Sequence, residues 1–252
     1  MTDYEKDVAT ELNDALNFSA YPNLKGQTVQ WISDDNEEKF NYNLTNHRSK
    51  LLETGISNTD ITYSINSNGF RSPEFEPGEW IAVAGCSFTF GVGVPLEHTW
   101  SKIVANHLGL QCANLGKPGA GPDTCFRMCY HWLPKLQPKA LIYFEPPPGR
   151  FEILNSTVKT TKDSGLHYAN IRTVSEKKFS IYAYWSRNFL NFELNYIKNK
   201  LAIQYICENL NIPMYSYKVY KDIQFDNMSR DLQHSGILAN KDFAEKICRE
   251  HF

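Results

Sequence analysis

The feature that most constrains this chain is an unbroken apolar run that ends in a polar turn. Residues 81–85 read Ile-Ala-Val-Ala-Gly, and Cys86 and Ser87 follow directly. A run without polar alternation is typical of a strand buried on both faces of a parallel sheet. Such sheets place reactive groups at the carboxyl ends of their strands, so Ser87 lies where a nucleophile would lie. A lone serine at a strand end also serves simply as a helix cap.

A second block near the other end of the chain favours the nucleophile. Residues 230–236 read Arg-Asp-Leu-Gln-His-Ser-Gly and place Asp231 three residues before His234. A serine hydroxyl needs a base within hydrogen-bond reach, and the base needs an acid that fixes its tautomer. One short loop can deliver both partners. The two blocks therefore predict a triad of Ser87, His234 and Asp231.

Together these residues resemble the SGNH (GDSL-type) hydrolases, over about 79–250. The resemblance implies a three-layer α/β/α sandwich with a short parallel sheet of flavodoxin-like order. It also implies an oxyanion hole. Residues 114–121 (Asn-Leu-Gly-Lys-Pro-Gly-Ala-Gly) match the second block, in which Asn114 opens the turn and Gly119 lends its N–H to the oxyanion.

The third block departs from the family. Its expected asparagine, an oxyanion donor, is replaced by Pro148 in the run Glu-Pro-Pro-Pro-Gly-Arg at 145–150, and proline can donate nothing. Loss of one such donor typically costs about 10²- to 10³-fold in rate. Arg150 is the candidate substitute, and Glu145 is a candidate substrate-binding residue. The alternative is that Arg150 only forms a salt bridge with Glu145 or Glu152.

We expect residues 1–75 to form an arm on a core domain of residues 76–252. The arm is predicted to contain an amphipathic helix at 4–17, an irregular stretch at 21–58 with a strand or helix turn, and an edge strand at 60–65. Arg71 follows, either reaching the pocket or bonding the backbone. The insertion at 151–185 is either a lid or specificity loop or a surface hairpin. Further strands are expected at 111–115, 140–144 and 214–219, and helices at 95–109, 123–136, 186–210 and 240–250.

Composition limits the classes of partner that the chain is expected to bind. The chain carries 26 basic and 28 acidic residues, for a net charge of −2, which gives no reason to expect a nucleic-acid partner. No apolar run suggests a membrane span or a secretory signal, so a cytoplasmic protein is expected. The six cysteines are expected to be free thiols. A metal site at Cys125, Cys129 and His131 is disfavoured because a fourth ligand and a second paired motif are missing. The predicted chemistry requires no metal or organic cofactor, and the oligomeric state is not indicated.

The expected activity is that of a serine esterase or acyl hydrolase. It would remove a short acyl group, such as acetyl, from a carbohydrate or another small ester through an acyl-enzyme. Three alternatives remain open: an O-acyltransferase using the same triad, a catalytically degenerate ligand-binding protein, and a structural protein that reuses the fold. The three intact triad residues favour an enzyme.

Overall fold

A four-stranded parallel sheet forms the centre of the molecule. The computed structural model describes residues 18–56, 61–153, 167–170, 188–223 and 226–252. The strand order is β4-β3-β5-β8, which in chain order reads 2-1-3-4 and is flavodoxin-like. Val83 pairs with Asn114 on one side and with Ile142 on the other. The strands are β3 (Trp80–Ala84), β4 (Gln111–Asn114), β5 (Leu141–Glu145) and β8 (Met214–Lys218).

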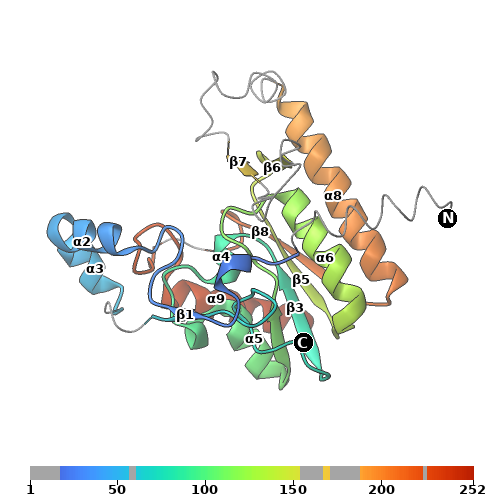
Figure 1. Cartoon of the computed structure of the whole chain (residues 1–252), viewed down its shortest axis with the longest axis horizontal. Helices are drawn as coiled ribbons and strands as arrows, with labels where there is room; N and C mark the ends of the chain where they lie inside the picture. The colour runs from blue at the N-terminus through green and yellow to red at the C-terminus, as the bar shows by residue number, and fades with distance from the viewer. Residues whose placement is uncertain (1–17, 57–60, 154–166, 171–187, 224–225) are drawn as a thin grey trace.

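Helices cover both faces of this sheet (Figure 1). The helices α5 and α9 pack together on one face, and α6 and α8 pack together on the other. All residues of β3 and β5 are buried, as the apolar run at 81–85 predicts. The predicted three-layer α/β/α sandwich is therefore confirmed. The helices are α5 (Trp100–Leu108), α6 (Pro122–Leu136), α8 (Phe189–Asn209) and α9 (Ile237–His251), with the short α4 (Ser87–Phe90) and η2 (Leu96–His98) between β3 and α5.

Helix ends deviate from the sequence prediction where local caps decide them. The last turn of α6 contains Pro134, and the helix ends where Gln137 adopts a left-handed conformation (φ 44°), one residue before the proline expected to stop it. The N-cap of α8 is Asn188, whose side chain accepts a hydrogen bond from Leu190 N. Both Ser186, the expected cap, and the helix predicted at 4–17 lie outside the described residues.

The arm is more helical than predicted. Two helices, α2 and α3, occupy part of the stretch predicted to be irregular, and they lie on the left of Figure 1. Asn36 caps α2 by accepting from Lys39 N, and Glu37 and Glu38 favour the helix start because they face the positive end of its dipole. Within the predicted edge strand, Tyr63 and Ser64 pair with an arm strand. The arm elements are η1 (Pro22–Leu24), β1 (Thr28–Val29), α2 (Glu37–Asn46), α3 (Arg48–Glu53) and β2 (Tyr63–Ser64).

A second apolar cluster joins the arm to the segment that follows Ser87. It consists of Ile32, Ile56, Ile61, Tyr63, Ile65, Phe90 and Val92, all buried. The side chains of Phe90 and Val92 thus pack among arm residues rather than in the main core. The arm therefore supports the turn that carries the candidate nucleophile.

Within the predicted insertion, β6 (Arg150–Ile153) and β7 (His167–Asn170) form an antiparallel pair. These two segments are therefore paired strands. The remainder of 151–185 lies outside the described residues. Across the described part of the chain, no helix combines the length and apolar character needed to cross a bilayer.

Candidate active site

Ser87 lies at the carboxyl end of β3 and is the first residue of α4. Its carbonyl accepts hydrogen bonds from Gly91 N at 2.9 Å and Val92 N at 3.2 Å, which closes the turn. The residue is only 5% exposed. As a first-turn residue it has an N–H without a carbonyl acceptor inside its own helix. That N–H is therefore a possible donor to an anion formed at the Ser87 side chain.

The structure brings Ser87, His234 and Asp231 into one hydrogen-bonded chain. Ser87 Oγ lies 2.8 Å from His234 Nε2, and His234 Nδ1 lies 2.6 Å from Asp231 Oδ2. A neutral imidazole that donates from Nδ1 to the carboxylate leaves Nε2 as acceptor for the serine hydroxyl. The three residues thus have the geometry of a nucleophile, a base and an orienting acid. Because 147 positions separate Ser87 from His234, this contact is a product of the tertiary fold.

The Asp231 carboxylate is held ionised by its own loop. Oδ1 accepts hydrogen bonds from Ser229 Oγ at 2.6 Å, Gln233 N at 3.0 Å and His234 N at 3.1 Å. Burial alone raises the pKa of Asp231, but the hydrogen bond and charge of His234 and the bonds from Ser229 and Gln233 outweigh burial and hold that pKa at about 2. The group is therefore a carboxylate at neutral pH.

Gly119 occupies the turn that follows β4. Ala120 N donates to Lys117 O at 3.0 Å, and Gly119 has φ +76°, as the third residue of a type II turn after Pro118 requires. Gly119 is exposed, and among the described residues its N–H carries no hydrogen bond. Since β3 and β4 are parallel neighbours, this turn and Ser87 lie at the same edge of the sheet.

Arg150 lies next to this turn rather than in a salt bridge. Its Nη1 donates to the Ala120 carbonyl at 3.3 Å, and its backbone packs against Gly121. Glu152 instead forms a bidentate ion pair with Arg127, at 3.0 and 2.8 Å. The alternative of an Arg150 salt bridge to Glu145 or Glu152 is therefore wrong.

Glu145 is held by helix α8. Its carboxylate accepts from Lys200 Nζ at 2.5 Å and from the Tyr196 hydroxyl, and the residue is 3% exposed. The prediction that Glu145 binds substrate or holds Arg150 is corrected, because both carboxylate oxygens bond to side chains of another element. Burial, followed by the hydrogen bond to Glu145, raises the pKa of Tyr196 above its ordinary range.

The side chain of Asn114 is hydrogen-bonded to the backbone within the fold. Its Nδ2 donates to Thr89 O at 2.7 Å, and its Oδ1 accepts from Gly116 N at 3.0 Å. With its amide used inside the fold, Asn114 ties the end of β4 to α4. Asn114 was predicted to be an oxyanion or substrate-binding residue. The structure corrects this, because its side chain supports the turn that carries Ser87.

Arg71 forms hydrogen bonds with the backbone, which is the second of the two alternatives predicted for it. Arg71 is 1% exposed, and its guanidinium donates to Gly91 O at 2.6 Å and Val94 O at 3.0 Å. It lies over the Tyr63 ring, 4.5 Å from the centroid. Burial lowers the pKa of Arg71 to about 10, so the side chain stays charged near neutral pH. It holds the segment that follows the candidate nucleophile.

Sequence reasoning missed the arm residues that reach the acid loop. Arg230 binds Asp35 through two hydrogen bonds, at 2.9 and 2.6 Å, and its guanidinium lies 4.2 Å from the centroid of the Trp31 ring. Lys39 Nζ lies 3.9 Å from Asp231 Oδ2. No local pattern signals either contact, since the sequence separations approach two hundred residues.

All six cysteines are free thiols, and five of them are buried. Burial, the largest cause, raises the pKa of both Cys125 and Cys129 well above the ordinary thiol value. Within the described residues, no group of three His, Cys, Asp or Glu side chains is placed to hold a metal ion.

Comparisons with known proteins give structural likenesses only. No family model matches the chain, and no curated protein matches it. Among solved structures, the psychrotrophic esterase EstA from Pseudoalteromonas sp. is 13% identical, with a TM-score of 0.35, over 68% of this chain and 95% of that one. A member of the lipolytic protein G-D-S-L family from Veillonella parvula DSM 2008 is 9% identical, with a TM-score of 0.35, over 69% of this chain and 98% of that one. The side-chain geometry is therefore the basis for assigning a function.

Proposed function

We propose that the protein is a serine ester hydrolase of the SGNH type. The observation that supports this best is the continuous chain of hydrogen bonds from Ser87 Oγ through the His234 ring to Asp231. A serine with a base at 2.8 Å, and that base with a carboxylate at 2.6 Å, is the arrangement that activates a hydroxyl for acyl transfer. A helix-capping serine would need neither partner.

The reaction has two halves. Ser87 Oγ attacks the ester carbonyl as its proton passes to His234 Nε2, and Asp231 stabilises the resulting imidazolium. Collapse of the tetrahedral intermediate breaks the bond to the alcohol oxygen, which takes the proton from His234, and leaves an acyl-serine. Water then attacks the acyl group, with His234 again as base, and release of the carboxylic acid restores the hydroxyl.

The oxyanion would be held by backbone N–H groups. We assign this role to Ser87 N–H, at the start of α4, and Gly119 N–H, in the exposed turn after β4. Arg150 is the proposed third donor. Its Nη1 already reaches the Ala120 carbonyl, one residue from Gly119, and its charged fork could turn from that carbonyl to a developing anion. This would compensate for Pro148, where the family has an asparagine.

The proposed substrate is a small ester carrying a short acyl group, such as an O-acetylated carbohydrate. An O-acyltransferase would use the same acyl-enzyme, with a sugar hydroxyl in place of water. A series of chromogenic esters of increasing acyl length, each assayed with and without added sugar acceptors, would separate these outcomes. Acyl-sugar formation at the expense of free acid would identify a transferase.

Labelling with a fluorophosphonate probe tests the proposal. The wild-type protein is expected to react at Ser87, located by mass spectrometry of the labelled peptide. Ser87→Ala should abolish labelling, and His234→Ala should slow it at least about 100-fold, since it removes the general base. A folded wild-type protein that does not label would instead favour the ligand-binding alternative, in which the missing asparagine marks a retired site.

A further inference from the structure

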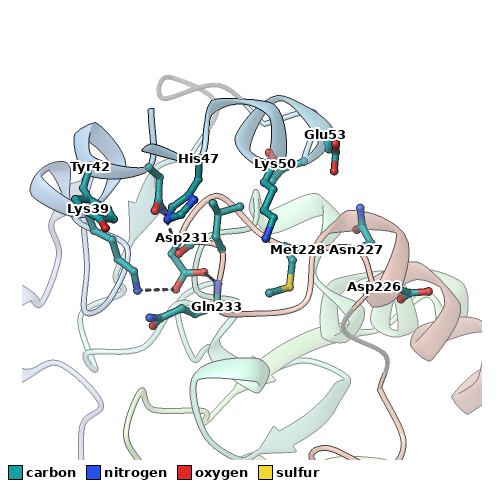
Figure 2. A pocket seen from close by; sticks show the side chains of 13 residues that line it. Lys39, Tyr42, His47, Lys50, Glu53, Asp226, Asn227, Met228, Asp231 and Gln233 are labelled. Carbon is teal, nitrogen blue, oxygen red and sulfur yellow. Dashed lines mark hydrogen bonds and ion pairs between the residues drawn. The ribbon is translucent and has the colours of Figure 1, made fainter. Parts of the chain in front are cut away.

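One cation of the arm faces the acid of the triad. Figure 2 shows the Lys39 side chain pointing toward Asp231. Lys39 Nζ lies 3.9 Å from Asp231 Oδ2, which is also the oxygen that accepts a hydrogen bond from His234 Nδ1. The Asp231 side chain is fully buried, whereas 22% of the Lys39 side chain is exposed. At 3.9 Å this contact is an ion pair rather than a hydrogen bond, so it acts mainly through charge. Lys39 is outside the part of the chain that resembles the SGNH hydrolases.

A closed ring of hydrogen bonds fixes the arm against the acid loop. The Arg230 side chain binds Asp35, and Asp35 Oδ2 accepts from the Tyr63 hydroxyl at 2.5 Å. Gly93 N donates to that hydroxyl at 2.9 Å, and Gly93 O accepts from Arg230 N at 3.0 Å. The ring thus connects the arm, the loop after Ser87 and the loop before His234. The position of α2, and with it Lys39, is set by the same contacts that set the acid loop.

Helix α2 is also tied directly to Asp231. Asn43 Nδ2 donates to the Asp231 carbonyl at 3.4 Å from the helix turn that follows Lys39. Lys39 N in turn donates to Asn36 Oδ1, which caps the helix. Lys39 is therefore on a short, capped helix that is hydrogen-bonded to Asp231. This bond keeps the Lys39 ammonium group close to the Asp231 carboxylate.

A cavity of about 570 Å³ separates α2 and α3 from the acid loop (Figure 2). It gives solvent access to the Lys39 side chain without exposing the Asp231 carboxylate. Lys50 and His47 line the same cavity, but no ion pair or hydrogen bond in the described structure joins either side chain to Asp231. Lys50 and His47 can therefore serve as control positions, because each lies near the acid loop without contacting Asp231.

We propose that Lys39 is a positioning residue of the triad, whose charge holds the Asp231 carboxylate toward His234 from outside the part of the chain that resembles the SGNH hydrolases. The inference rests on the proposed function. Lys39 would act through Asp231 and would not touch the substrate.

The charge of Lys39 also gives the role a pH signature. A cation beside Asp231 stabilises the carboxylate and opposes a second positive charge on the His234 ring. Without the charge of Lys39, the pH profile of the reaction should therefore move upward relative to the wild type. Other charged or titratable groups near the pair are the Arg230–Asp35 ion pair, whose charges balance, and His47, Lys50, Glu53 and Asp226 around the cavity.

The experiment measures the rate of fluorophosphonate labelling from pH 5 to pH 9 for the wild type and for Lys39→Met. We expect the half-maximal rate to move up by about one pH unit, so that labelling is about tenfold slower on the acid side and within about threefold of the wild type at pH 9. Lys39→Arg should restore the wild-type profile. Lys50→Met and His47→Gln, on the same cavity, should leave it unchanged, and His47→Gln also tests whether that histidine causes the pH effect.

Chemical rescue supplies a second measurement. Because the cavity is open to solvent, ethylammonium should restore part of the labelling rate of Lys39→Ala, whereas the neutral analogue ethanol should not. Equal loss at every pH, an unchanged profile, or equal rescue by ethanol would overturn the inference. Each of these outcomes presupposes a wild-type protein that labels. A wild type that does not label would instead contradict the proposed function.

Discussion

At the scale of single residues, Asp231 shows how a buried acid is kept charged. Three hydrogen bonds to Oδ1 and one from the His234 ring to Oδ2 replace the water that burial removes. Because the pKa of this acid is lowered on folding, ionisation of Asp231 stabilises the folded protein above its unfolded pKa. This contribution, about 2 kcal/mol for a fall in pKa from 3.8 to about 2, is lost as the pH falls through the folded pKa.

We therefore expect Asp231 to remain ionised to a lower pH than ordinary aspartates. Its carboxyl carbon can be followed by ¹³C NMR and identified by its absence in Asp231→Asn. The signal should show no titration above about pH 3, since its midpoint is expected at about pH 2. A midpoint near 4 for Asp231 would show that its hydrogen bonds do not outweigh its burial.

At the scale of elements, the site depends on two loops that approach closely at Gly93. This residue has φ +71°, and a Cβ there would lie 2.7 Å from Ser229 Oγ and 3.0 Å from Ser229 Cβ. Ser229 Oγ is itself a donor to Asp231. An added methyl group at residue 93 would therefore push on the acid loop of the triad as well as strain its own backbone.

Gly93→Ala should thus reduce both stability and labelling, and Gly109→Ala separates the two causes. Gly109 has φ +68° but no atom within 4 Å of an added Cβ, so its substitution introduces backbone strain alone. We expect Gly109→Ala to cost about 1–2 kcal/mol of unfolding free energy with unchanged labelling. Gly93→Ala should cost about 1–3 kcal/mol more and slow labelling of the folded protein. Urea denaturation and probe kinetics measure these effects, and equal labelling by both variants would contradict the role of this contact.

The same loops show which contacts a sequence can predict. Asp231 and His234 were predicted as partners because they lie three positions apart in a loop with a recognisable pattern. The buried strands were predicted because their apolar runs are continuous. The Asp35–Arg230 pair was not, because its members are 195 positions apart and lie in unpatterned polar segments. Glu145 was misassigned for the same reason, since its partner Lys200 is on a helix 55 positions further on.

At the scale of the whole molecule, the site lies at the point where the order of the strands reverses. The chain goes from β3 to β4 on one side and then crosses to β5 on the other, which leaves the carboxyl end of β3 between two diverging connections. Ser87 occupies this point. The arm covers part of the same end of the sheet through the cluster that includes Phe90 and Val92. The arm and the nucleophile segment therefore share one packed cluster.

This shared packing predicts a single unfolding transition. The apolar cluster of the arm includes Phe90 and Val92 from the nucleophile segment, and the Tyr63 hydroxyl bonds both Asp35 and Gly93. The arm cannot separate without disturbing the triad, so far-UV circular dichroism and fluorophosphonate labelling should be lost at the same urea concentration. Tyr63→Phe removes one buried hydroxyl and leaves Asp35 and Gly93 without that partner. It should lower the unfolding free energy by about 1–3 kcal/mol and move both urea midpoints down together. Tyr217→Phe, which removes the hydroxyl bonded to Glu250 at the far end of α9, is the control and should keep the two transitions coincident with a smaller loss of stability. Labelling lost well before the circular dichroism signal would show instead that the arm unfolds independently of the core.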